Sequence, residues 1–274
     1  MKRVADALEV SRSNLYERLK PRPERSSCAQ AEDEVELREA IRAICDARPG
    51  YGYPRVSAVL NRDRSRHGLP RVNRKKVYRI MGAENLLLQK FGRKPTRTHD
   101  GKVMTLASNL RFCTDIFHVS CWNGDLVRVA FVMDCCDREV VAHHATSDGL
   151  TGEAIRDLMI ATIEARFGGN LQPPQRAQWL SDNGPQYTAR ETVQFGRQLG
   201  FDICTSPAYS PESNGMAEGF VKRFKHDYVY VNELRNAGVV LRSIPAWIED
   251  YNNNAPHSAL RMRSPREFRQ SRIH

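Results

Sequence analysis

The sequence predicts an α/β fold, a mixed five-stranded sheet with flanking helices, preceded by small all-α units of the helix-turn-helix type. Two observations carry this prediction. From about residue 107 onward, strand-like runs joined by short turns are followed by helices that alternate with further strands. Before that point, apolar residues recur at helical spacing in short segments, separated by stretches that contain Pro and Gly.

The charge of the chain divides at nearly the same place. The 274 residues include 42 Lys and Arg against 32 Asp and Glu, a net charge of +10. Residues 1–104 contain 24 basic and 13 acidic residues, whereas residues 105–274 contain 18 and 19. An asymmetry of this size favours a front part that binds a polyanion, followed by a domain of a different kind.

The first 20 residues predict part of a helix-turn-helix, in which Ser11 caps a helix over 12–19. Polar side chains of that helix would face a DNA groove: Arg12, Ser13, Asn14 and Arg18. A plain amphipathic helix pair is the alternative. Residues 21–31 follow, with the Pro and Ser content of a linker.

Residues 32–89 predict a second helical DNA-binding domain. A helix over 32–47 ends at the Pro49–Pro54 stretch, a short helix covers 55–61, and a further helix covers 74–81 behind an Asn cap. This last helix would turn four basic side chains outward: Arg74, Lys75, Lys76 and Arg79. A solvated helix face is the alternative interpretation. Residues 90–106 predict a basic linker that could follow a phosphate backbone.

Residues 107–235 predict one larger α/β domain, with a C-terminal helix and tail over 236–274. Three strands joined by short turns should form an antiparallel meander: 112–120, 126–134 and 139–146. The elements then alternate: a helix over 151–167, a strand over 177–181, a helix over 189–199, a strand over 201–205 and a long helix from about 215. This order is that of a ribonuclease-H-like fold.

The composition argues against a membrane protein and against a disulfide framework. No apolar run approaches the roughly 20 residues that a membrane-spanning helix needs. Asp6 interrupts the segment where a signal peptide would be apolar, so we expect a cytoplasmic protein. The seven cysteines form no Cys-x-x-Cys pair and no Cys/His zinc spacing, so we expect free thiols in a reducing compartment.

Three carboxylates fall where this order of elements can bring them together: Asp115, Asp182 and Glu218. Asp115 lies midway along the first strand, Asp182 at the end of the fourth, and Glu218 at the start of the long helix. An acid inside an apolar strand is costly unless it is paired or binds a metal. Three carboxylates can hold two divalent cations, Mg²⁺ or Mn²⁺, which drive phosphodiester chemistry. Singly, Asp182 could be a turn residue and Glu218 a helix N-terminal carboxylate.

Each carboxylate lies in a longer motif: Thr114-Asp-Ile116, Ser181-Asp-Asn-Gly-Pro-Gln-Tyr187 and Ser210-Pro-Glu-Ser-Asn-Gly-Met-Ala-Glu-Gly-Phe-Val-Lys-Arg-Phe-Lys225. The second and third acids are separated by 35 residues. Three further segments belong to the same pattern: Tyr51-Gly-Tyr-Pro-Arg55, Tyr251-Asn-Asn-Asn-Ala-Pro-His-Ser-Ala-Leu260 and Ser264-Pro-Arg-Glu267. Together they resemble bacterial insertion-sequence transposases of the retroviral-integrase superfamily, with its DDE catalytic core. The likeness is to the second-frame (OrfB) product of elements with two overlapping reading frames.

The resemblance implies a Mg²⁺-dependent DNA transposase, a polynucleotidyl transferase and endonuclease. Asp115, Asp182 and Glu218 would be the catalytic residues and the ligands of two Mg²⁺ ions, with Asp115 bridging both. The enzyme would cleave DNA at insertion-sequence ends and catalyse strand transfer and integration. Lys225 would contact the end DNA, and Lys222 shares that helix face by spacing alone. A surface salt-bridge role for the two lysines is the alternative.

The resemblance also implies the partners and the place of action. Double-stranded DNA would be bound as terminal inverted repeats and as target, by a homo-oligomer that brings two ends together. A first-frame product would be joined to the chain by a frameshift fusion. No membrane is involved, and the protein would act on the bacterial nucleoid in the cytoplasm.

Two other functions stay open at this point. One is a ribonuclease-H-like nuclease that cuts without joining, and the other is a non-catalytic or domesticated DNA-binding regulator. The basic first 104 residues argue against a simple nuclease, which needs no reader of DNA ends. The three intact acids argue against a loss of catalysis.

Overall fold

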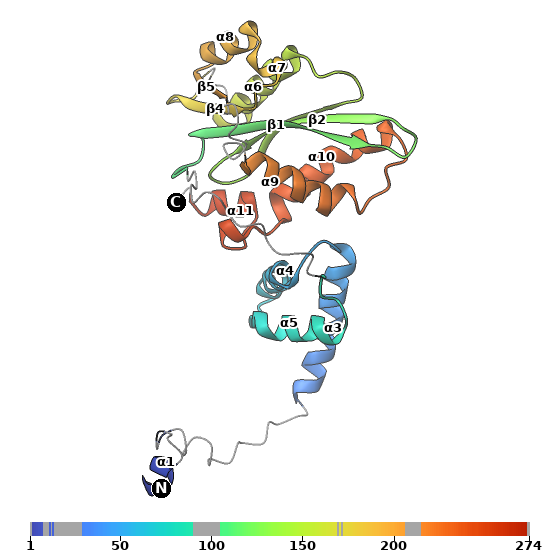
Figure 1. Ribbon diagram of the computed structural model, residues 1–274, viewed down its shortest axis with the longest axis vertical. Coiled ribbons are helices and arrows are strands. Elements are labelled where there is room, and N and C mark those ends of the chain that lie inside the picture. Colours follow the sequence, from blue (N-terminus) through green and yellow to red (C-terminus); the bar gives the residue numbers. More distant parts are fainter. Residues whose placement is uncertain are drawn as a thin grey trace. The chain divides into compact units, whose positions relative to one another are not determined.

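Figure 1 shows the computed structural model, which describes residues 2–7, 11, 13, 29–89, 105–168, 170, 172–205 and 215–272. The chain divides into two compact units, Met1–Arg42 and Ala43–His274. Three of the predicted DNA-facing residues lie outside the described residues: Arg12, Asn14 and Arg18. Most of both predicted linkers lies outside them as well. The domain boundaries drawn from the sequence therefore stay predictions.

The first unit holds α1 (Lys2–Ala7) and the larger part of α3 (Ala29–Ala47). Leu37 and Ile41 are buried and lie four residues apart, so they share one face of α3, as the apolar stripe predicts. The helix begins at Ala29, earlier than predicted. Its first residues, Ala-Gln-Ala, are strong helix formers that carry no apolar periodicity.

The second unit starts with two helices, α4 (Tyr53–Arg66) and α5 (Arg74–Ala83). The short helix predicted over 55–61 is wrong in length. Pro54 lies in the first turn of α4, where a missing N–H costs no hydrogen bond, so it starts the helix instead of breaking it. The predicted Asn73 cap of α5 is confirmed, since its side chain accepts a 2.8 Å hydrogen bond from the backbone N–H of Lys75.

The mixed five-stranded sheet is confirmed, with the strand order β3-β2-β1-β4-β5. Its strands are β1 (Arg111–Ser120), β2 (Leu126–Asp134), β3 (Val140–Thr146), β4 (Ala177–Ser181) and β5 (Phe201–Thr205). β1, β2 and β3 are antiparallel neighbours, whereas β4 is parallel to both β1 and β5. β1 is therefore the central strand, where the antiparallel meander meets the parallel part.

Helices cover both faces of the sheet, as Figure 1 shows. One face carries α6 (Gly152–Phe167), α7 (Pro185–Thr188) and α8 (Arg190–Gln198); the other carries α9 (Gly215–Phe224) and α10 (Ala237–Asn254). Alternation along β1 divides its side chains between two cores. Phe112 joins the α6 side, whereas Cys113, Phe117 and Val119 join the α9 and α10 side. Asp115 has the same parity as Phe117 and so belongs to the α9 side.

The chain beyond α9 continues without a loop into a π-helical turn, η2 (Lys225–Val229). A 3₁₀ turn, η3 (Ser258–Leu260), and α11 (Pro265–Gln270) complete the described chain after α10. Ser264 caps α11 in a capping box with Glu267. Among the described helices, none has both the length and the apolar character that crossing a membrane requires.

Candidate active site

Asp115 lies near the middle of β1, half-buried, on the face covered by α9. Its Oδ1 accepts a 2.8 Å hydrogen bond from the backbone N–H of Ile116. Burial raises the pKa of Asp115 from 3.8 to about 6; the Ile116 hydrogen bond lowers it, and the charges of Asp182 and Glu218 raise it. The negative charges of the other two carboxylates of the predicted triad therefore act on Asp115.

Asp182 follows β4 directly and is exposed. The parallel register sets Cys113 of β1 opposite Leu180 of β4, so the same register continued by two residues leads from Asp115 to Asp182. The backbone N–H of Gly184 donates a 3.0 Å hydrogen bond to Asp182 Oδ1. The turn role considered for Asp182 is therefore real, and this hydrogen bond stabilises the turn that follows β4.

Glu218 lies in the first turn of α9 and is exposed. Its position depends on the aromatic residues with which α9 packs onto the sheet. The Phe220 ring lies 4.5 Å from the Phe131 ring of β2, and the Phe224 ring lies 5.6 Å from the Phe117 ring of β1. These contacts place the helix N-terminus, which favours a carboxylate, over the central strand.

The donor set fits a hard divalent cation in its chemistry, because all three candidate ligands are carboxylates and Asp115 carries a raised pKa. The side chains are not gathered into a ready site. Within the part of the chain that the structure describes, no group of three or more His, Cys, Asp or Glu residues could hold a metal ion as it stands. Asp182 and Glu218 are exposed, so both are free to change rotamer toward Asp115.

Tyr187 supports this end of the sheet, a role that the sequence did not reveal. Its hydroxyl lies 3.1 Å from Thr114 Oγ1, and both side chains are buried. This hydrogen bond ties the residue before Asp115 to α7, which begins directly after the Asp182 turn. Burial raises the pKa of Tyr187, so its hydroxyl stays protonated. The only sequence signal was its place at the end of the Ser181–Tyr187 motif.

Lys222 and Lys225 follow Glu218 by one and two helical turns. Lys222 is exposed, and Lys225 lies with its Nζ 5.8 Å from the centroid of the Phe117 ring. Burial and the positive charges of Arg128 and Lys225 lower the pKa of His118, a residue of β1. Lys225 is thus held against the strand that carries Asp115.

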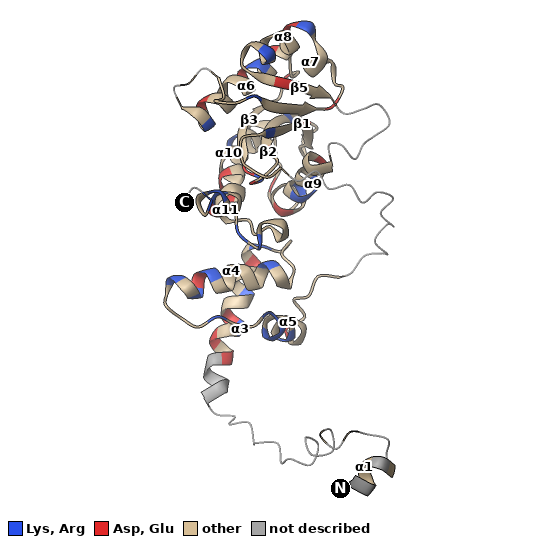
Figure 2. Cartoon of the chain, turned by 90° about the vertical axis from the view of Figure 1, so that its left-hand side faces the viewer, with Lys and Arg blue, Asp and Glu red and all other residues tan. Residues whose placement is uncertain are grey.

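The four basic residues predicted on the outside of α5 lie on its surface, with Lys76 half-buried: Arg74, Lys75, Lys76 and Arg79. Val77, Ile80 and Met81 form the buried face of the same helix. Figure 2 shows Lys and Arg along α5 and α4. Whether this surface binds DNA stays a prediction.

Comparison with known proteins gives the family. Residues 106–211 and 199–265 match two models of the integrase core domain, and residues 32–94 match an HTH-like domain. The chain is 39% identical over 273 residues to transposase InsD for insertion element IS2A/D/F/H/I/K of Escherichia coli, covering 98% of this chain and 90% of that protein. The chain belongs to this family of insertion-element transposases. The interpretation drawn from the sequence motifs is confirmed.

Two solved structures are similar to this transposase. A chain of the simian T-cell lymphotropic virus intasome, solved with PP2A regulatory subunit B56 gamma, is 18% identical with a TM-score of 0.49, covering 86% of this chain and 76% of that one. The catalytic core domain of BIV integrase is 20% identical with a TM-score of 0.40, covering 61% of this chain and 97% of that one.

Proposed function

We propose that this transposase cleaves DNA at the ends of its insertion element and then transfers the freed 3′-hydroxyl to another strand. The observation that carries the proposal is the parallel register of β1 and β4, which leads from Asp115 to Asp182, together with the packing of α9, which carries Glu218, over β1. A half-buried carboxylate with two acidic neighbours destabilises the folded state unless a cation compensates the negative charge.

Asp115, Asp182 and Glu218 would hold two Mg²⁺ ions, for which Mn²⁺ can substitute. Bound there, the ions would supply Lewis-acid activation of the attacking oxygen and of the leaving oxygen. Asp115 would contribute its carboxylate from β1, whose backbone is paired with β2. Asp182 and Glu218 would close on the site from a turn and a helix end.

The basic residues would hold the DNA. Lys222 and Lys225 would bind phosphates beside the cleaved bond, while Arg74, Lys75, Lys76 and Arg79 of α5 would bind the terminal repeat farther from it. Arg12, Asn14 and Arg18 would add contacts from the front of the chain. In this division, residues 32–89 bind DNA, residues 90–106 link and residues 107–235 catalyse.

The partners follow from the chemistry. Joining two element ends requires both in one complex, so the active species would be a homo-oligomer on double-stranded DNA. A first-frame product fused by frameshifting would enlarge the DNA-binding front. The site of action would be the bacterial nucleoid.

Product analysis separates this proposal from a nuclease of the same fold. The full chain is incubated with Mg²⁺ and a labelled duplex that carries the terminal inverted repeat. We expect cleaved strands and, in addition, longer strands formed by joining. Cleaved strands alone would leave a nuclease, and binding without either product would leave a DNA-binding regulator.

A further inference from the structure

Three motif segments that the active site does not use lie in the second unit: Tyr51–Arg55, Tyr251–Leu260 and Ser264–Glu267. Arginines near its start pair with acids of its C-terminal part: Arg48 with Asp250, Arg55 with Asp227 and Arg62 with Glu267. Arg55 and Arg62 lie seven residues apart on α4 and so share one face. That face of α4 is therefore bound to the part of the chain that follows α9.

The Arg55–Asp227 pair is the most buried of the three. The two terminal nitrogens of Arg55, Nη1 and Nη2, donate to the Asp227 carboxylate over 3.1 and 2.7 Å. The side chains of Arg55 and Asp227 are 11% and 2% exposed. The Arg55 guanidinium also lies 3.5 Å from the centroid of the Tyr51 ring. A planar, bidentate and stacked arrangement of this kind is one that lysine cannot reproduce.

Gly50 brings the two parts into close contact at the same point. A Cβ at Gly50 would lie 2.6 Å from Nδ1 of His226 and 2.9 Å from Oδ1 of Asp227. No other residue than glycine fits without moving one of these side chains. The segment before α4 and the η2 turn are thus fitted to each other.

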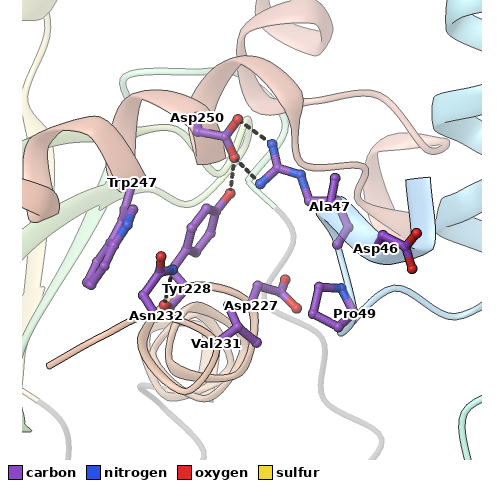
Figure 3. A pocket seen from close by; sticks show the side chains of 10 residues that line it. Asp46, Ala47, Pro49, Asp227, Tyr228, Val231, Asn232, Trp247 and Asp250 are labelled. Carbon is purple, nitrogen blue, oxygen red and sulfur yellow. Dashed lines mark hydrogen bonds and ion pairs between the residues drawn. The ribbon is translucent and has the colours of Figure 1, made fainter. Parts of the chain in front are cut away.

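A second ion pair lies beside the first and is more open to solvent. Arg48 donates to both carboxylate oxygens of Asp250 over 2.7 and 2.6 Å, and the Tyr228 hydroxyl donates to Asp250 Oδ2 over 2.7 Å. Figure 3 shows the Tyr228 hydroxyl pointing toward Asp250. Both residues, with Asp227, line a pocket of about 300 Å³. The third arginine, Arg62, pairs with Glu267 and donates to the backbone oxygen of Asn254.

Asp227 belongs to the same continuous helical segment as Glu218. η2 follows α9 without a break, so Asp227 lies nine residues after Glu218, about 13 Å farther along the helix axis. Because α4 packs with α5, the ion pair connects the helix with the basic surface to the helix with the candidate catalytic glutamate. Together with the Arg48–Asp250 and Arg62–Glu267 pairs, these contacts link the two places within the second unit.

We propose that Arg55, Asp227 and Gly50 are positioning residues that set where the DNA is cut. They hold the terminal repeat, bound at α5, at a fixed distance from the phosphodiester at the carboxylates. The inference rests on the proposed function. The contacts of Gly50 and Arg55 with Asp227 form a joint between the two parts. Loosening this joint would leave the carboxylates intact but let the DNA slide relative to them, so that cleavage weakens and spreads over neighbouring positions.

The test compares two duplexes with the full chain and Mg²⁺. One duplex carries the whole terminal repeat, and the other keeps only the base pairs around the cleavage site. For Asp227→Asn we expect the rate at the wild-type position on the whole repeat to fall by about 10- to 100-fold, because a buried arginine loses its partner and the DNA is misplaced. On the short duplex, which cannot reach α5, Asp227→Asn and wild type cut at equal rates.

Two further variants give the test its controls. Asp202→Asn removes the exposed Arg176–Asp202 pair, which lies outside the joint, and leaves both rates unchanged. Arg55→Lys keeps the charge but loses the bidentate bonds and the stacking, so it resembles Asp227→Asn and not wild type.

The outcomes separate the two proposals. Equal losses on both duplexes would show a general folding defect and overturn the positioning role, as would unchanged cleavage of the whole repeat by both joint variants. A wild-type chain that cuts neither duplex would overturn the proposed function itself.

Discussion

His257 is expected to make the folded chain lose stability in acid. Its side chain is 7% exposed, and its Nε2 is buried with no hydrogen-bond partner among the described residues. Burial, with the positive charges of Arg223, Arg138 and Arg55, lowers the pKa of His257 from 6.5 to about 3. These arginines come from α9, from the β2–β3 turn and from α4, so positive charge faces the imidazole from three directions.

The sign of the effect follows from which state binds the proton. The unfolded chain binds it near pH 6.5, whereas the folded chain binds it only near pH 3. Stability from the neutral imidazole is therefore complete above pH 6.5 and is lost as the pH falls through the window toward about 3. Linkage gives a loss of about 2 kcal/mol in the free energy of unfolding between about pH 7 and about pH 5.

Urea unfolding at these two pH values measures the effect, with His257→Gln as the variant that cannot titrate. Other groups titrate as well. Burial raises the pKa of Asp134 to about 6, which acts in the opposite sense. Subtracting the variant's change from the wild type's cancels such terms and leaves that of His257. Equal losses of stability in wild type and variant would refute the reasoning.

Three further predictions concern packing and DNA binding. Gly50→Ala should destabilise the folded state by about 1–3 kcal/mol, because the added Cβ would lie 2.9 Å from Oδ1 of buried Asp227. Gly149→Ala, with no atom within 4 Å of its Cβ, should be neutral in the same urea titration. Phe220→Ala should lower the free energy of unfolding by about 3–5 kcal/mol, because the residue is 4% exposed and its ring packs on Phe131, Phe224 and Tyr251. Truncating exposed Trp122 to Ala should cost much less. Similar losses for the two variants would contradict the placing of Phe220 in the core. Lys225→Ala should weaken binding of terminal-repeat DNA and lower the slope of log K against log salt by about one, and an unchanged slope would exclude a phosphate contact.

Local pattern was enough to predict the sheet. The apolar residues of β1, Phe112, Cys113 and Phe117, alternate between two cores, and short turns return β2 beside β1 and β3 beside β2. The predicted strand limits consequently agree with the structure to within one residue. The places of Asp115, Asp182 and Glu218 follow from that order of elements together with the neighbouring positions of β1 and β4.

Contacts between distant segments could not be predicted in this way. Arg55 and Asp227 are 172 residues apart, and no periodicity links them. The Thr114–Tyr187 hydrogen bond depends on how α7 packs against the sheet, and the sequence of a four-residue helix does not predict that packing. Pro54 was misjudged because a proline that starts a helix and one that breaks it look alike in a sequence. The motif segments indicated which regions matter, but they did not identify the residues that contact one another.

The most direct test of the account is the rate of cleavage and joining when each carboxylate becomes its amide. Full chains carrying Asp115→Asn, Asp182→Asn or Glu218→Gln are compared with wild type and with Asp202→Asn on terminal-repeat DNA in Mg²⁺. We expect each of the three variants to fold, to bind the DNA and to yield neither cleaved nor joined strands, while Asp202→Asn behaves as wild type. Wild-type levels of product from any one of the three would contradict it.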